Sequence, residues 1–169
     1  MLSDEHLRCF GSIMNLYANA ESFLKLCISK MTGADITDVL ILTAPYTSMQ
    51  LRNVARSLAK ERDLSNDLVA LFEHMIDEFA ASSTIRNYIA HSRWTQGKHK
   101  AKIRPTGVDI RQGKLVLLDR VKTPEYSLKD LKNQEKKLQD LCSLIIAWML
   151  ESGALTEEAF AKIKEGTAP

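Results

Sequence analysis

The chain has 169 residues, enough for one ordinary domain with its own hydrophobic core. Apolar types make up 45% and charged types 26%, which is typical of globular proteins and excludes a disordered or disulfide-dense chain. The 23 basic and 21 acidic residues leave a formal charge of +2, which argues against a polycation that coats nucleic acid or anionic membrane. We therefore expect a single domain over residues 1–169.

The cysteines and the first residues of the chain bear on its compartment. Cys9, Cys27 and Cys142 are far apart and form no Cys-x-x-Cys pair, so neither a disulfide framework nor a zinc knuckle is indicated. The N-terminus has no basic segment followed by an apolar one, and no uncharged apolar run approaches the roughly 20 residues of a membrane span. These features predict a cytoplasmic protein that is neither exported nor embedded in a membrane.

Apolar residues recur every three or four positions over most of the chain, the pattern of amphipathic α-helices. Ser3 and Ser127 are expected to cap the first and last long helices, and Gly33 and Gly153 to end them. The cluster Ala81-Ser82-Ser83-Thr84 is expected to break or kink the chain. The helices predicted in chain order span residues 3–31, 35–42, about 49–58, 64–79, 85–94 and 127–153, followed by a short amphipathic tail at 156–164.

The segment from Thr95 to Pro124 breaks the helical pattern. Glycines and prolines punctuate short apolar runs there, which predicts a β-hairpin or ordered insert at about 95–124. We therefore expect an all-α fold: an antiparallel helical bundle of four to five main helices, with a small β-hairpin insert before the last long helix.

The most informative stretch runs from Arg86 to Trp94. On a helix, Asn87 and His91 are one turn apart, so Asn87 can orient the imidazole. Trp94 falls on roughly the same face as these two residues, and Arg86 flanks it. The stretch therefore predicts an organised polar face.

Arg86 is followed directly by Asn87, and four residues separate it from His91. This pattern, on a late helix of a small α-bundle, resembles the signature of HEPN domains (higher eukaryotes and prokaryotes nucleotide-binding). Many of these are metal-independent endoribonucleases of toxin–antitoxin, abortive-infection and RNA-processing systems, and the motifs of two protomers meet in one cleft. The resemblance implies catalytic roles for Arg86, Asn87 and His91, a homodimer, and an antitoxin or regulatory protein as partner. One subfamily has a Tyr two residues after the His, where this chain has Arg93, so a nucleotidyltransferase antitoxin is not indicated.

The chemistry suits these residue types. Imidazole titrates near pH 6.5, so at neutral pH one His91 can accept the proton of a 2′-OH while a second donates one. Arg86 would stabilise charge on the phosphate, so neither a metal nor another cofactor is expected. Single-stranded RNA should be cleaved to a 2′,3′-cyclic phosphate and DNA should be inert. The alternative is a non-catalytic, dimeric HEPN-fold module that binds a protein partner or nucleotide, with Arg86 and His91 solvated or structural.

Charge is concentrated near the motif. Six basic residues and no acidic one lie between Arg86 and Arg104, whereas the rest of the chain holds 17 basic against 21 acidic residues. Such a strip can hold a phosphate backbone, with Trp94 available for base stacking; the alternative for 98–104 is a solvated loop. The residues expected to bind RNA are Arg93, Trp94, Lys98, Lys100, Lys102 and Arg104.

Glu21 continues the apolar stripe of the first helix, where a carboxylate is costly unless it is paired. We expect it to contact Arg86 or His91 and to fix the site. The alternative is that its face is exposed or that it binds a backbone group.

Residues 73–78 form an acidic group in which His74 and Glu78 are one helical turn apart, a spacing that can bind one metal ion. A di-iron bundle needs Glu-x-x-His motifs on two helices, and the sequence has none. A solvated acidic face is the better interpretation.

Overall fold

The computed structural model describes residues 2–99, 101–111, 114–117, 124–153 and 156. The chain divides into two compact units. The first unit comprises Met1–Tyr17 with Ser82–Gln139, and the second comprises Ala18–Ala81 with Asp140–Pro169. The boundaries between the units fall within three long helices, α1 (Asp4–Thr32), α4 (Asn66–His91) and α5 (Leu128–Glu151).

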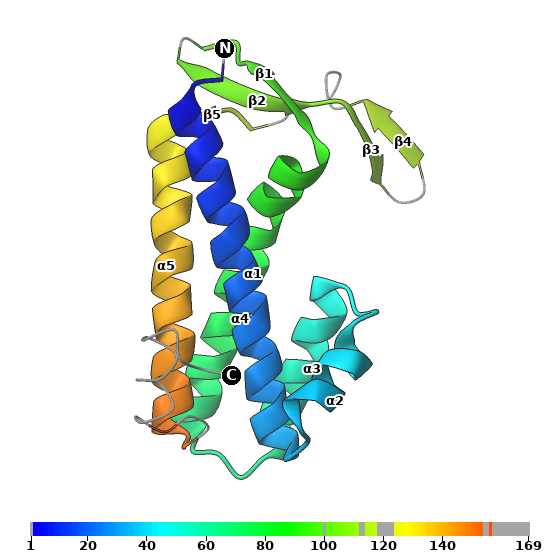
Figure 1. The fold of residues 1–169 in the computed structure, drawn as a ribbon, viewed down its shortest axis with the longest axis vertical. Coiled ribbons are helices and arrows are strands. Elements are labelled where there is room, and N and C mark those ends of the chain that lie inside the picture. The colour runs from blue at the N-terminus through cyan, green and yellow to red at the C-terminus, as the bar shows by residue number, and fades with distance from the viewer. Residues whose placement is uncertain (1, 100, 112–113, 118–123, 154–155, 157–169) are drawn as a thin grey trace. The chain divides into compact units, whose positions relative to one another are not determined.

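The described residues form five helices and five strands (Figure 1). The helices are α1 (Asp4–Thr32), α2 (Ile36–Thr43), α3 (Ser48–Glu61), α4 (Asn66–His91) and α5 (Leu128–Glu151). The strands are β1 (Arg93–Gln96), β2 (Lys102–Thr106), β3 (Val108–Arg111), β4 (Lys114–Leu117) and β5 (Tyr126–Ser127). The predicted all-α class, with a small β insert before the last long helix, is confirmed. The predicted tail at 156–164 lies, except for Thr156, outside the described residues.

Side-chain caps explain where the later helices begin. The Thr47 side chain accepts the N–H of Gln50, and the Gln50 side chain accepts the N–H of Thr47, a capping box that starts α3. Ser127 does the same at α5, as predicted: its Oγ accepts the N–H of Asp130 at 3.1 Å, and the Asp130 carboxylate accepts the Ser127 N–H at 2.8 Å. The Asp130 carboxylate also accepts the Ser127 hydroxyl at 2.7 Å, and the bonds that it accepts from the Ser127 N–H and hydroxyl lower the pKa of Asp130.

Of the break or kink expected at residues 81–84, the break is wrong, because α4 runs unbroken from Asn66 to His91, and the kink stays a prediction. Serine and threonine hydroxyls can bond to a carbonyl one turn back, so a helix tolerates them when packing favours it. The positions on either side are core positions: Phe79 is 0% and Ile85 is 3% exposed. Burial therefore outweighs the weak helix preference of the cluster.

The predicted helix to Trp94 is also wrong. The helix ends at His91, and β1 begins at Arg93, so the insert starts two residues earlier than expected. It contains two hairpins rather than one. β1 and β2 pair antiparallel and β5 adds to the other edge of β2, whereas β3 pairs with β4 in a separate sheet.

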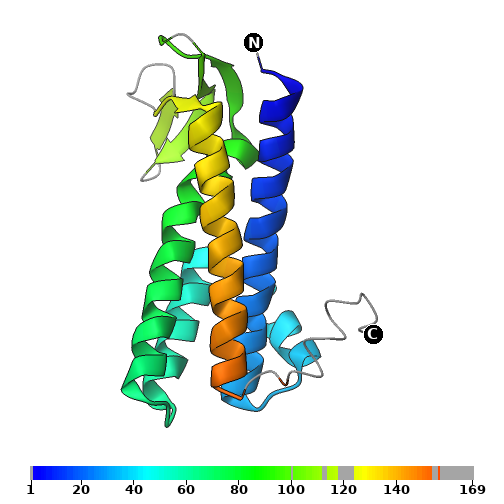
Figure 2. The same cartoon turned by 90° about the vertical axis from the view of Figure 1, so that its left-hand side faces the viewer.

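In the first unit, the β1–β2–β5 sheet lies near the N-terminal ends of α1 and α5 (Figures 1 and 2). An aromatic cluster joins the sheet to α1: the Trp94 ring centroid lies 4.7 Å from that of Phe10 and 5.8 Å from that of Tyr126. α1 and α5 are joined by the Ser12 hydroxyl, which donates to Glu135 at 2.6 Å. The buried apolar residues of this unit are Cys9, Phe10, Ile13, Tyr17, Ile85, Ile103, Leu131 and Leu138.

In the second unit, the packing centres on Trp148 of α5. Its ring centroid lies 4.7 Å from that of Phe72, and its Nε1–H donates to the carbonyl of Leu68 at 2.9 Å. The largest fully buried side chains of this unit are Trp148, Phe72, Phe79, Leu24, Leu51, Met75 and Ile76. None of the helices in the described part of the chain is long and apolar enough to cross a membrane.

Candidate functional site

Arg86 is held by two neighbours in the first unit. Its guanidinium carbon lies 5.5 Å from the centroid of the Tyr17 ring, and its Nη1 donates to Oδ1 of Asn87 at 3.1 Å. Tyr17 is only 2% exposed, so its ring is a fixed platform. A guanidinium has five N–H donors, and the bond to Asn87 uses one of them. The half-buried Arg86 is therefore positioned and retains the capacity to bind an anion.

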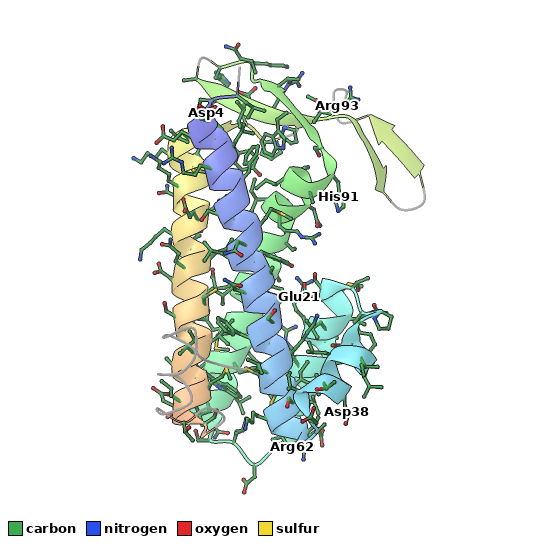
Figure 3. The ribbon with its side chains drawn as sticks, viewed as in Figure 1. Asp4, Glu21, Asp38, Arg62, His91 and Arg93 are labelled. Atoms are coloured by element: carbon green, nitrogen blue, oxygen red, sulfur yellow. The ribbon has the colours of Figure 1, made fainter. Side chains whose placement is uncertain are left out.

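His91 is the last residue of α4 and is exposed (Figure 3). Among the described residues, its imidazole has no hydrogen-bond partner. The expected bond from Asn87 is absent there, and the Asn87 side chain bonds Arg86 through its carbonyl oxygen. Sequence spacing alone does not show whether Asn87 bonds Arg86 or His91, since Arg86 is adjacent in the chain and His91 is one helical turn away.

Glu21, on the predicted apolar stripe, pairs with Lys25 one turn further along α1 (N–O distance 3.1 Å). The Glu21 side chain is 30% exposed, so the carboxylate is only partly removed from water. Glu21 belongs to the second unit, and Arg86 and His91 belong to the first. Its role in fixing these two residues stays a prediction.

The sheet register gathers three cations on one face, which we call the basic face: Arg93, Lys102 and Arg104. Arg93 and Arg104 are two ladder positions apart, since Arg93 pairs with Thr106 and Arg104 with Thr95. Side chains alternate between the faces of a strand, and residues opposite one another share a face. Arg93 is exposed, and Lys102 and Arg104 are half-buried. The register thus assembles half of the predicted RNA-binding set.

Trp94 lies on the opposite face of this sheet. It pairs with Pro105, one position out of phase with Arg93 and Arg104, and its indole belongs to the aromatic cluster with Phe10 and Tyr126. The expectation that Trp94 shares a helical face with His91 is wrong, because Trp94 is in β1. Its geometry is that of a residue that joins the sheet to the core.

The turn between β1 and β2 carries the remaining predicted RNA-binding residues. The backbone N–H groups of Lys98 and His99 donate to Oε1 and Oε2 of Glu125 at 2.7 and 3.2 Å, and both side chains are exposed. These bonds, that from Lys98 foremost, lower the pKa of Glu125. A Cβ at Gly97 would lie 2.8 Å from the Glu125 carboxyl carbon, so a larger residue there would displace the Glu125 side chain. Lys100 lies outside the described residues.

Sequence reasoning missed Glu125 as a neighbour of the basic strip. The residue follows the strip by about 20 positions, and only the pairing of β5 with β2 brings it to the turn. No local signal in the sequence identifies it, because the pairing of β5 with β2 joins segments far apart in the chain. The structure thus places the Glu125 carboxylate beside the β1–β2 turn. The Asp130 carboxylate, whose pKa is lowered first by its bonds from Ser127, lies close enough to Lys102 for the lysine charge to lower that pKa further.

The acidic group on α4 is partly paired rather than wholly solvated. Asp77 accepts from Arg56 of α3 at 2.6 Å, and Glu73 pairs with Lys60 of α3 at 3.1 Å. Figure 2 shows α3 alongside this part of α4. Within the described ranges, no group of three side chains that could hold a metal ion occurs. These carboxylates therefore join two helices of the second unit.

The cysteines offer no reactive thiol. All three lie in the described part of the chain, are buried and form no disulfide there. Burial raises the pKa of Cys27 to about 12 and that of Cys142 to about 11. Both thiols therefore stay protonated near neutral pH and are poor nucleophiles.

The fold and the site define an all-α protein with an Arg-Asn-x3-His motif at the end of a long helix and a basic sheet face in the same unit. Comparison with protein-family models, curated proteins and solved structures found no match for this chain.

Proposed function

We propose that this protein is a HEPN-like, metal-independent endoribonuclease that cleaves single-stranded RNA as a cytoplasmic homodimer, in a toxin–antitoxin or phage-defence system. The observation that carries the proposal is the grouping, within the first unit, of a positioned Arg86, an exposed His91 and the basic face. A nuclease of this kind needs a cation for the phosphate, an accessible proton-transfer group and a path for the backbone.

The helix geometry supports a dimeric site. At about 100° per residue, Arg86 and His91 leave the axis of α4 roughly 140° apart, so they cannot share one face of one helix. Two copies of α4 can place both residue types in one cleft. One His91 then accepts the proton of the attacking 2′-OH, and the His91 of the other copy protonates the leaving 5′ oxygen.

Arg86 acts on the phosphate in this scheme. Attack by the 2′ oxygen on phosphorus places additional negative charge on the non-bridging oxygens, and a planar guanidinium can donate two parallel hydrogen bonds to them. The Tyr17 ring and Asn87 hold the guanidinium before substrate arrives, which lowers the entropic cost of positioning it. The P–O5′ bond breaks, and a 2′,3′-cyclic phosphate and a 5′-OH are formed.

The basic face and the β1–β2 turn contact the RNA backbone. Lys102 and Arg104 project from β2 and Arg93 from β1, and the exposed Lys98 extends the positive surface. Such contacts are largely insensitive to sequence and weaken as salt rises. Trp94 serves the fold through the aromatic cluster, so any base stacking falls to other groups.

The proposal is tested with two oligonucleotides of the same sequence in a metal chelator, one all-RNA and one with 2′-deoxy sugars throughout. The RNA is expected to be cut to fragments that end in a 2′,3′-cyclic phosphate, and the 2′-deoxy strand is expected to stay intact. Intact RNA, or equal cleavage of both strands, would overturn the proposal.

One observation favours the non-catalytic alternative, a dimeric module that binds a protein partner or nucleotide. Arg86 already contacts two groups of its own chain, as a structural residue would. If this alternative is right, Arg86→Ala changes the oligomeric state, and no RNA cleavage exists to be lost. Sedimentation of the wild type and this variant distinguishes the two functions.

A further inference from the structure

A cavity of about 310 Å³ lies in the second unit, where α1 and α5 end and the chain passes from α3 to α4. Figure 3 labels Arg62, which is one of its lining residues. Small-molecule sites in proteins have volumes of about 300–1,000 Å³, and an apolar cavity of about 150 Å³ already holds benzene. The cavity is therefore large enough for a one-ring or two-ring molecule.

One part of the cavity lining is apolar and rigid. It is formed by Met31, Leu64 and Trp148. The Trp148 indole is fixed by its bond to the Leu68 carbonyl and by its contact with Phe72, and it is only 1% exposed. Because the indole is almost fully covered and its N–H is already bonded, Trp148 forms the floor of the cavity and offers no donor to a ligand.

The rest of the lining is charged. Lys30 and Arg62 are exposed cations, and Asp63 is a carboxylate beside them. Arg62 is the C-cap of α3, and its extended backbone (φ −96°, ψ 150°) turns the chain away from the helix. Its carbonyl accepts the N–H of Leu64 at 2.8 Å. Two cations against one carboxylate leave the cavity with a net positive charge.

Arg62 differs from the two preceding cations of α3 because those two form ion pairs. Arg56 and Lys60 each form an ion pair with α4. Within the part of the chain that the structure describes, neither Arg62 nor Lys30 has such a partner. Unpaired cations beside an apolar wall are the arrangement that binds an anionic group attached to an apolar body.

We propose that this cavity binds a small organic anion with an aromatic or other apolar body. The anionic group contacts Lys30 and Arg62, and the body packs against Met31, Leu64 and Trp148. The Asp63 carboxylate repels anions, so it weakens the binding of the anionic group and does not contact it. The proposal goes beyond RNA cleavage and shares no residue with the Arg86 and His91 motif.

The test uses naphthalene-2-sulfonate as the anionic probe and 2-naphthalenemethanol as the neutral control of similar shape. Binding to the full chain is followed by calorimetry and by the indole N–H resonances in NMR. The protein has two tryptophans, and the other, Trp94, lies in the first unit, so the resonance that moves identifies the site. The sulfonate is expected to shift the Trp148 resonance and to bind at least about tenfold more tightly than the alcohol.

Substitutions at exposed positions show which charges contribute to binding, and they are not expected to unfold the protein. Lys30→Gln and Arg62→Gln should each weaken sulfonate binding about threefold to tenfold. Asp63→Asn should strengthen it, and Lys60→Gln, outside the lining, should leave it unchanged. The proposal is overturned if no binding occurs up to millimolar probe, if the alcohol binds as well as the sulfonate, if Trp94 alone responds, or if Lys60→Gln weakens binding as much as Arg62→Gln does.

Discussion

The guanidinium carbon of Arg86 lies 5.5 Å from the centroid of the buried Tyr17 ring. A cation–π contact at a partly exposed site contributes about 0.5–1 kcal/mol to stability. Arg86→Ala should therefore lower the free energy of unfolding by about 1 kcal/mol, as measured by urea denaturation followed by tryptophan fluorescence. A loss above about 3 kcal/mol would mean that Arg86 is chiefly structural and would favour the non-catalytic module.

The Glu125 carboxylate should control the β1–β2 turn as a function of pH. Its pKa is lowered from 4.5, so its bonds to the N–H groups of Lys98 and His99 are present above that value and are lost as the pH falls through the lowered pKa. The two amide resonances should titrate together in NMR with a midpoint below 4.5. Glu125→Ala should abolish the pH dependence of these two resonances. A midpoint at or above 4.5 would contradict the assignment.

Core and surface positions of the second unit should respond very differently to substitution. Trp148→Phe removes the hydrogen bond from the indole N–H to the Leu68 carbonyl and opens space beside Phe72, so it should cost about 1–3 kcal/mol of unfolding free energy. Ile41→Ser, at a side chain that is 67% exposed, should change it by less than about 0.5 kcal/mol. Urea denaturation measures both values, and similar costs at the two positions would contradict the described packing.

Local signals in the sequence predicted the helices well and the sheet poorly. Ser127 caps α5, and Gly33 and Gly153, with φ of 70° and 68°, lie just beyond the ends of α1 and α5, because these signals act within one turn. The break at 81–84 was wrong because the burial that holds a serine-rich helix together depends on residues far away in the chain. The spacing of Trp94 fits both a helix and a strand, so periodicity alone does not show that it lies in β1.

The candidate site was predictable in its residues but not in its contacts. The Arg86, Asn87 and His91 pattern is visible in the sequence, whereas the choice of Asn87 to bond Arg86 depends on side-chain geometry. The basic face needs the pairing register of β1 with β2, which spacing alone does not give. Glu125 reaches the turn only through β5, a strand of two residues.

A site shared by two copies makes a quantitative prediction about mixed dimers. If cleavage needs His91 from both copies, equal amounts of wild type and His91→Ala leave about one quarter of the dimers intact after exchange. RNA cleavage per wild-type chain should then fall to about half, and further as the variant is added in excess. Cleavage that stays proportional to the wild-type chain alone would show that each copy acts independently.

The most direct test of the central claim is the rate of RNA cleavage by His91→Ala in chelator, with His74→Ala as the control. Both histidines are exposed residues of α4, and His74 lies in the second unit, away from the motif in sequence. Loss of a proton-transfer group should slow cleavage by roughly 10²- to 10⁴-fold in His91→Ala and leave His74→Ala at the wild-type rate. Cleavage by His91→Ala at the wild-type rate would contradict the account.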